Sequence, residues 1–237
     1  MSRGPDAGSF GSGGGPGGGS GGGLFRVAGR LSFSSAEIRD LLIAWIVLGV
    51  AFALFFAGGG TAGVRLLLTP GFLVAVVVSL LTAGVGFLLH ELAHKVVAVR
   101  FDQIAEFRAD YGMLFVALMG ALIGFIFAAP GAVYHRGRVT ERELGLIALA
   151  GPVTNVLLAA LFLPVLVVGV SGGSSLVTLV GSRGIAINLF LAAFNMIPFG
   201  SLDGKTVYNW SKVVFLAVFL PSAALAAVAV LGLPLGF

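Results

Sequence analysis

Long apolar runs separated by short polar stretches constrain the fold of this chain more than any other feature of its sequence. A helix needs about 20 predominantly apolar residues to cross the hydrocarbon core of a bilayer. Only 10% of the 237 residues are charged, and this leaves too little polar sequence to cover a soluble core. The sequence therefore predicts an all-α polytopic membrane protein with about five to six transmembrane helices. The expected spans lie near residues 36–57, 71–99, 144–170, 174–198 and 210–232.

A further apolar stretch, residues 112–131, is ambiguous by hydropathy. Lys and Arg concentrate in the cytoplasmic loops of membrane proteins. If 112–131 enters the membrane and returns, every Lys and Arg except Arg65 and Arg183 faces the cytoplasm, which is 12 of the 14. A full crossing would place the basic loop 134–143 outside. We therefore expect a re-entrant element, covered by protein because lipid cannot satisfy irregular backbone, and a cytoplasmic N-terminus.

The N-terminal segment differs in composition from the rest of the chain. Residues 1–23 are rich in Gly, Ser and Pro, and such sequence buries too little apolar surface to fold. We expect a disordered cytoplasmic tail and a short interfacial or strand-like stretch within 1–33, followed by one membrane-embedded domain over 34–237. Ser34 and Glu37 have the spacing of a capping box, which predicts the start of the first helix.

Cysteine content and net charge narrow the function classes. The chain has no cysteine, which excludes disulfides and thiolate metal ligands. Its net charge of +4 is spread between the apolar runs, so the basic residues indicate membrane topology rather than a nucleic-acid surface. We expect the protein to be surrounded by the lipid bilayer and to have no nucleic-acid partner. The sequence does not define its oligomeric state.

The motif "HELAH" places His90, Glu91 and His94 inside the second apolar run. The two histidines are four residues apart, so both imidazoles project from one face of a helix and can reach one zinc ion. Glu91, beside them, has the position of the general base in a zinc hydrolase. The alternative is a polar helix face that lines a cavity, but ionisable residues within a span favour a functional site.

A catalytic zinc needs a third protein ligand, and Asp203 is the candidate. It lies in the segment "NMIPFGSLDG" at the end of the fourth span, where unwound backbone can line a cavity. An exposed Asp-Gly turn is the alternative. With a re-entrant 112–131, His90, His94 and Asp203 all lie near the cytoplasmic face. The remaining histidine, His135, is expected in a surface loop.

Two asparagines are candidates for contact with a substrate. Asn155, in "AGPVTN" of the third span, and Asn195, which opens the Asp203 segment, are amides in apolar sequence. Such an amide can hydrogen-bond a substrate carbonyl or stabilise a developing oxyanion, or it can join two helices by a packing contact. Both interpretations stay open for these two residues, and packing is favoured for Asn188.

Together, "HELAH", "AGPVTN" and "NMIPFGSLDG" resemble the motifs of the site-2 protease family of intramembrane zinc metalloproteases, over residues 71–210. The resemblance implies one Zn²⁺ per chain, with Glu91 activating water. The implied zinc ligands are His90, His94 and Asp203.

The other matching positions carry further implications of this resemblance. Asn155 is implied to lie near the substrate, and Asn195 and Pro198 match the unwound entry to the aspartate motif. A re-entrant β-type element is implied after the first motif. The chain departs from the family at Ser201 and Lys205, where Pro and a second Gly are common. The resemblance therefore does not define the backbone conformation around Asp203.

The function implied is hydrolysis of peptide bonds within or near transmembrane segments of membrane-protein substrates, which is regulated intramembrane proteolysis. The compact core and the Gly/Ala/Val-rich, Lys-poor composition are compatible with a prokaryotic cell membrane. Two other classes of protein are alternatives. A metal-ion transporter needs ligands along a path, whereas this chain offers one cluster. A catalytically silent scaffold is expected to lack Glu91 or a ligand, and all four residues are present.

Overall fold

The computed structural model describes residues 25–27, 31–126 and 130–233. The predicted disordered tail, 1–23, lies outside the described residues. Within the expected interfacial stretch, β1 (Phe25–Val27) and β2 (Leu31–Phe33) form an antiparallel pair.

Five helical segments in the described part of the chain are long and apolar enough to cross a membrane, and each coincides with an expected span. They are α1 (Ser35–Phe56), the continuous segment Gly71–Arg100, α6 (Glu141–Ser171), α7 (Ser175–Asn195) and α9 (Lys212–Gly232). The protein is therefore an all-α, multi-pass membrane protein with two small two-stranded sheets.

The second span is not one uniform helix. It consists of α3 (Gly71–Ser79), the π-helical turn η1 (Leu80–Gly84) and α4 (Val85–Arg100). A π-helical turn inserts one extra residue and rotates everything that follows it, and such turns are frequent near functional sites. The rotation therefore sets which face of α4 meets the rest of the bundle.

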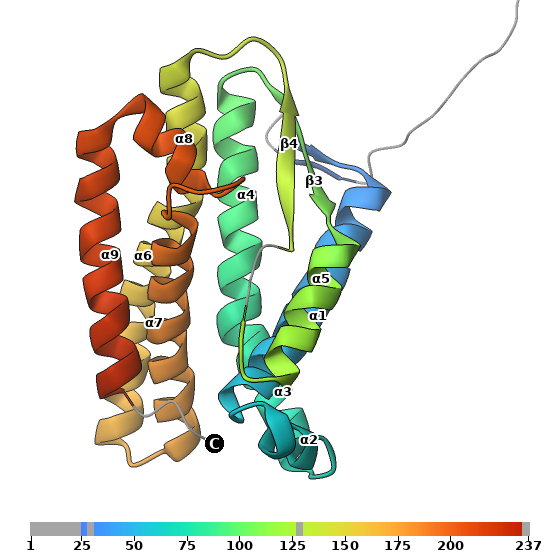
Figure 1. Ribbon diagram of the computed structural model, residues 1–237, viewed down its shortest axis with the longest axis vertical. Helices are drawn as coiled ribbons and strands as arrows, with labels where there is room; N and C mark the ends of the chain where they lie inside the picture. The colour runs from blue at the N-terminus through green and yellow to red at the C-terminus, as the bar shows by residue number, and fades with distance from the viewer. Residues whose placement is uncertain (1–24, 28–30, 127–129, 234–237) are drawn as a thin grey trace, which may run out of the picture.

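The helix α4 lies in the middle of the molecule (Figure 1). On one side of it stand α6, α7 and α9, and on the other stand α1 and α5 (Tyr111–Leu122). A buried apolar cluster joins α1, α4, α5 and α7 across this arrangement. Its larger members include Leu48, Phe52, Phe87, Leu114 and Ile187. The central position of α4 gives its polar face neighbours from several helices.

The ambiguous stretch enters the bundle and comes back. The antiparallel strands β3 (Ile104–Ala109) and β4 (Gly131–Arg136) frame it, and the descending limb is α5. Asp110 caps α5 by accepting a hydrogen bond from Met113 N, 3.0 Å away. Asp110 N also donates to Pro130 O, 2.8 Å away, so the stretch ends where it begins. The expected return over 112–131 is present, with a helical descending limb and the β-type part at its two ends.

Three local features differ from expectation. The helices α2 (Gly60–Leu67) and α8 (Asp203–Trp210) lie in segments expected to be loops. Ser34 does cap α1, since its hydroxyl accepts from Glu37 N at 3.1 Å. The Glu37 carboxylate does not return the bond, because it binds Lys95 instead. The predicted capping box is thus only half formed.

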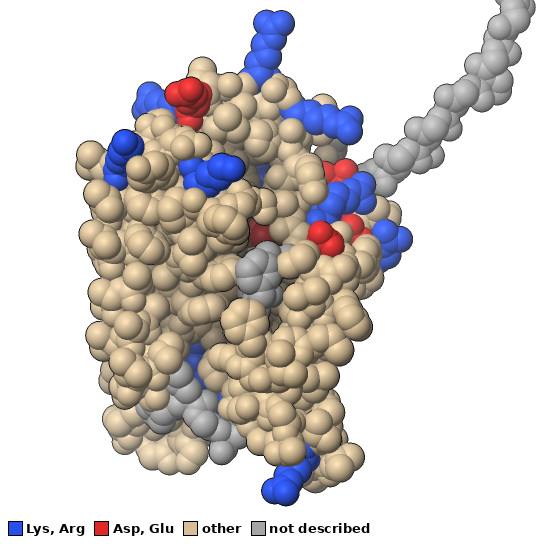
Figure 2. Space-filling model, in the orientation of Figure 1, with Lys and Arg blue, Asp and Glu red and all other residues tan. Residues whose placement is uncertain are grey.

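Basic side chains gather over the end of the molecule that carries α8 and the strands (Figure 2). Arg65 belongs to α2, at the opposite end, and Arg183 is buried within α7. These are the two basic residues that are not expected to face the cytoplasm. The distribution of charge along the long axis therefore agrees with a chain whose apolar stretch 112–131 does not cross.

Candidate metal centre

The helix α4 buries the whole "HELAH" face. His90, Glu91 and His94 are all buried, and the two imidazole rings meet edge to face with their centroids 4.6 Å apart. Residues four apart on a helix lie one above the other, so the two rings point into the same space. Burying three ionisable side chains in an apolar bundle is costly unless each has a partner.

Asp203 reaches these histidines from the other end of the fourth span. After α7 ends at Asn195, a series of tight turns leads to α8, whose first residue is Asp203. Asp203 Oδ2 lies 3.2 Å from His90 Nε2 and 3.3 Å from His94 Nε2. The structure therefore brings together the three residues that the sequence predicts as ligands, although Ser201 precedes and Lys205 follows the aspartate.

The opposite side of each imidazole is held by α6. His90 Nδ1 lies 2.6 Å from Asn155 Oδ1, and His94 Nδ1 lies 2.7 Å from Ile147 O. Both partners are acceptors, so each Nδ1 carries the proton and donates it. Each Nε2 then keeps a free lone pair, directed at Asp203. Hydrogen bonds of this kind fix the tautomer and orientation of metal-binding histidines.

Three observations test whether this group fits a metal ion. One ligand atom from each of His90, His94 and Asp203 lies within 4.8 Å of the others. Ligand atoms about 2.0–2.1 Å from a tetrahedral zinc lie about 3.3 Å apart, and the two nitrogen-to-oxygen distances match this spacing. Asp203 Oδ2 is buried and accepts no hydrogen bond. Two nitrogens and a carboxylate oxygen are ligands that zinc accepts, so the group fits.

Gly151 explains why "AGPVTN" accompanies the histidines. A Cβ atom at this position would lie 2.5 Å from Nε2 of both His90 and His94. Only glycine lets the α6 backbone approach the two rings so closely. The Gly-Pro pair of the motif thus opens a place for the imidazoles, and three residues later Asn155 hydrogen-bonds one of them.

Asn155 does not face open space. It is fully buried, and its Nδ2 donates to Gly86 O at 3.1 Å and to Asn188 Oδ1 at 2.9 Å. With Oδ1 engaged by His90, the amide is used on both sides. Of the two interpretations open from the sequence, these contacts are of the packing kind, and Asn188 joins them. The rotation of the helices about their axes decides which neighbours Asn155 contacts, and no sequence motif indicates that rotation.

A cavity of about 280 Å³ opens beside these residues. His90, Glu91, His94 and Asp203 line it, together with Asn195 and with strand β4. Asn195 Nδ2 donates to Leu191 O within its own helix. His135 also lines the cavity, from β4. Its expected place in a surface loop is wrong, because the basic residues around it obscured the alternation of a strand.

Comparison with known proteins gives the family. A protein from Methanocaldococcus jannaschii named "Putative zinc metalloprotease MJ0611" is 40% identical over 192 residues, which cover 80% of this chain and 92% of that relative. The chain belongs to this zinc metalloprotease family. "Putative zinc metalloprotease YwhC" of Bacillus subtilis is 31% identical over 143 residues, which cover 54% of this chain and 65% of that relative. No protein-family model and no solved structure matches the chain.

Zinc is accordingly the cofactor of this metalloprotease. In the described part of the chain, His90, His94 and Asp203 are the one group of three or more such side chains close enough together to share a metal ion. The relatives named here come from an archaeon and a bacterium, which indicates a prokaryotic origin.

Proposed function

We propose that this zinc metalloprotease is an intramembrane protease of the site-2 type, which hydrolyses peptide bonds within or next to transmembrane segments of membrane proteins. The observation that carries the proposal is the place of the metal centre. His90, Glu91 and His94 are buried among apolar spanning helices, and Asp203 joins them at a cavity lined by α1, α4, α6 and α7. A substrate segment at that depth is itself a membrane-embedded segment.

The proposed roles follow from the geometry. His90, His94 and Asp203 hold the zinc, and Asn155 and Ile147 O keep the two imidazoles in the required tautomer. Bound zinc polarises the scissile carbonyl and lowers the pKa of a water molecule. Glu91 takes a proton from the water as its oxygen attacks the carbonyl carbon, and passes that proton to the leaving nitrogen as the C–N bond breaks.

The substrate must be extended at the scissile bond, because a helix hides its own peptide bonds. Strand β4 offers a place for it. Phe107 and Ala109 of β3 pair with Val133 and Gly131, and their N–H groups point away from β4. In an antiparallel ladder the backbone groups of Gly131 and Val133 then point to the outer edge of β4. Both residues line the cavity, so an extended substrate can pair beside Glu91, with Asn195 in reach of it.

The proposed orientation places the metal centre near the cytoplasmic face of a prokaryotic membrane. The end of the molecule with α8 and the strands carries most of the visible basic side chains, and such residues favour the cytoplasmic side. The N-terminus is then cytoplasmic, the partners are a transmembrane substrate and the surrounding lipid, and no nucleic acid is involved.

The test is cleavage of a single-span reporter by purified protein in liposomes, with bound zinc measured on every variant. Glu91→Gln is compared with wild type and with Glu141→Gln, a matched change at an exposed glutamate. Loss of the general base lowers cleavage by about 10²–10⁴-fold, while zinc stays bound and Glu141→Gln matches wild type. Reporters whose spans contain Gly, Pro or Asn are cut faster than Leu-rich ones.

Cleavage that survives Glu91→Gln unchanged removes Glu91 from the mechanism. Zinc bound to wild type without cleavage of any reporter favours a silent scaffold.

A further inference from the structure

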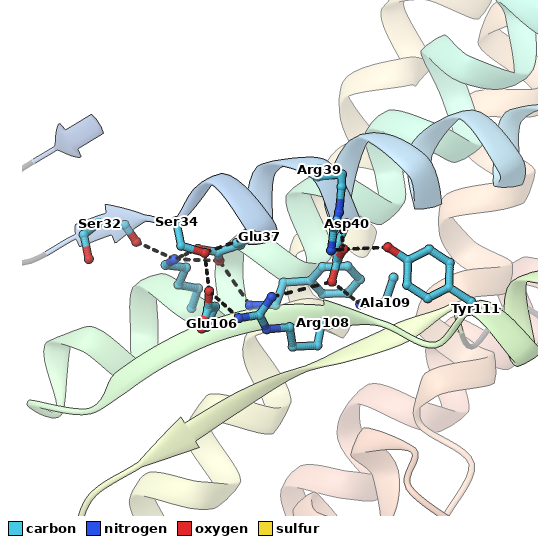
Figure 3. Close-up of polar contacts among 11 residues, drawn as sticks. Ser32, Ser34, Glu37, Arg39, Asp40, Glu106, Arg108, Ala109 and Tyr111 are labelled. Carbon is cyan, nitrogen blue, oxygen red and sulfur yellow. Dashed lines mark hydrogen bonds and ion pairs between the residues drawn. The ribbon is translucent and has the colours of Figure 1, made fainter. Parts of the chain in front are cut away.

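Two carboxylates at the start of α1 are buried although the metal centre does not use them. The side chains of Glu37 and Asp40 are 1% and 4% exposed, respectively. Figure 3 shows both pointing from α1 toward strand β3. A buried carboxylate in an apolar protein is costly unless it is paired and hydrogen-bonded, so the partners of these two groups indicate what they do.

Their partners include the outer edge of β3. Phe107 N donates to Glu37 Oε1 at 3.1 Å, and Ala109 N donates to Asp40 Oδ2 at 3.3 Å. These residues are two apart, so both N–H groups lie on the edge opposite β4. The two carboxylates therefore occupy the place that a third strand would take. They close the edge of β3 and leave the edge of β4 for the cavity.

Glu37 also binds the metal-centre helix. Lys95, the residue after His94, donates from Nζ to Glu37 Oε1 at 2.6 Å and to Ser32 O at 2.6 Å. The same Nζ lies 4.0 Å from the centroid of the Phe33 ring. Glu37 thus connects α4 to β3 through one carboxylate. We call Glu37, Asp40 and Lys95 the α1–β3 cluster.

Further contacts hold the same face. Tyr111 donates to Asp40 Oδ1 at 2.7 Å, which ties the start of α5 to α1. Glu106 accepts from Ser34 and pairs with Arg108 at 3.0 Å. The chain is therefore fixed to the start of α1 from Glu106, within β3, to Tyr111, at the start of α5. Its partner β4 lines the cavity, so the height of β4 beside Glu91 depends on these contacts.

We propose that Glu37 and Asp40 are positioning residues that, through β3, set the register of β4 against α4 for binding an extended substrate, while Lys95 neutralises the buried Glu37. The proposal rests on the proposed function for its substrate, but not for its structural part. A purely stabilising ion pair has no need of carboxylates, because apolar side chains of similar volume often replace a buried pair without loss. A positioning role needs an acceptor for Phe107 N–H.

Two double variants separate these roles. Glu37→Gln with Lys95→Met removes the ion pair but keeps an acceptor oxygen for Phe107 N–H. Glu37→Met with Lys95→Met removes the acceptor as well. Because the chain has no cysteine, a spin label at Tyr134→Cys, an exposed position on β4, reports the mobility of that strand without background.

We expect the Met/Met variant to show a more mobile label and a KM raised about tenfold, since it leaves a buried N–H without an acceptor. Its kcat and bound zinc stay at the wild-type level. The Gln/Met variant matches wild type in label mobility and KM. Comparing Asp40→Leu with Asp40→Asn repeats the test at Ala109 N–H. This second comparison decides the outcome if the Met/Met variant does not fold.

Equal label mobility and equal KM in the two members of each pair would overturn the proposal. If wild type cleaves no reporter, the proposed function fails by itself, and the label still decides whether the α1–β3 cluster holds β4.

Discussion

Two of the groups of charged side chains buried in the described part of this apolar protein differ in their hydrogen bonding. In the α1–β3 cluster, Glu37 and Lys95 satisfy one another and two backbone groups. In the metal centre, Asp203 Oδ2 accepts no hydrogen bond and faces two imidazole nitrogens beside a cavity. The first arrangement is complete within the chain, whereas the second is complete only with a cation. Buried charged groups whose hydrogen bonds are all made within the chain indicate a positioning role. A buried polar atom without a hydrogen-bond partner needs an explanation, and here a bound cation provides it.

The largest expected effect is at the unsatisfied group. Asp203→Ala removes the anionic ligand and leaves two neutral imidazoles, which are too few for a stable catalytic zinc site. We expect bound zinc to fall from about one per chain to near zero, with cleavage lost. Elemental analysis of purified protein measures this. The control is Lys205→Ala, an exposed change in the same short helix. Full zinc occupancy in Asp203→Ala would show that the ligand set is different.

The satisfied group is expected to respond in stability instead. Lys95→Met leaves the Glu37 carboxylate buried without its cation, and breaking a buried pair in this way costs about 3–5 kcal/mol. Unfolding in detergent would measure the loss. Zinc per folded chain stays at the wild-type level, because no metal ligand changes. Lys212→Met, at an exposed lysine, is the control, and an equal loss there would remove the distinction between the groups.

The smallest effect is expected behind the metal centre. Asn155→Ala deletes the acceptor of His90 Nδ1, and loss of such a partner lowers metal affinity by about 10–100-fold. Competition with a chelator measures it, with Thr154→Ala, the neighbouring residue on α6, as the control. Unchanged zinc affinity together with a loss of cleavage would instead return Asn155 to the substrate-contacting role open from sequence.

The large features were predictable because they depend on local pattern. Apolar length gave the five spans, and the four-residue spacing of His90 and His94 gave one face of a helix. Asp203 was predictable as a ligand from the topology. The distribution of basic residues required 112–131 to return, and this placed the aspartate at the same membrane face as the two histidines. In each case one simple physical rule decides the outcome over a long stretch of chain.

The rest depends on contacts between distant segments. Glu37 and Lys95 are 58 positions apart, and nothing in either neighbourhood announces the pair. The π-helical turn η1 rotates α4 by an amount that periodicity alone does not reveal, so the sequence could not say that Asn155 meets His90 rather than the cavity. His135 was missed because charged neighbours outweighed the alternation of the short strand β4.

Asp110 and Pro130 lie at the same end of the molecule, because Asp110 N donates a hydrogen bond to Pro130 O. The segment between them therefore adds no crossing to the number of spans. The five candidate spans of the described residues are an odd number, and α1 accordingly begins at one end of the molecule while α9 ends at the other (Figure 1). The metal centre lies near one end only, and would change compartment if the protein were inverted. The direction of insertion, rather than any side chain of the site, therefore decides which aqueous phase supplies the zinc and the hydrolytic water.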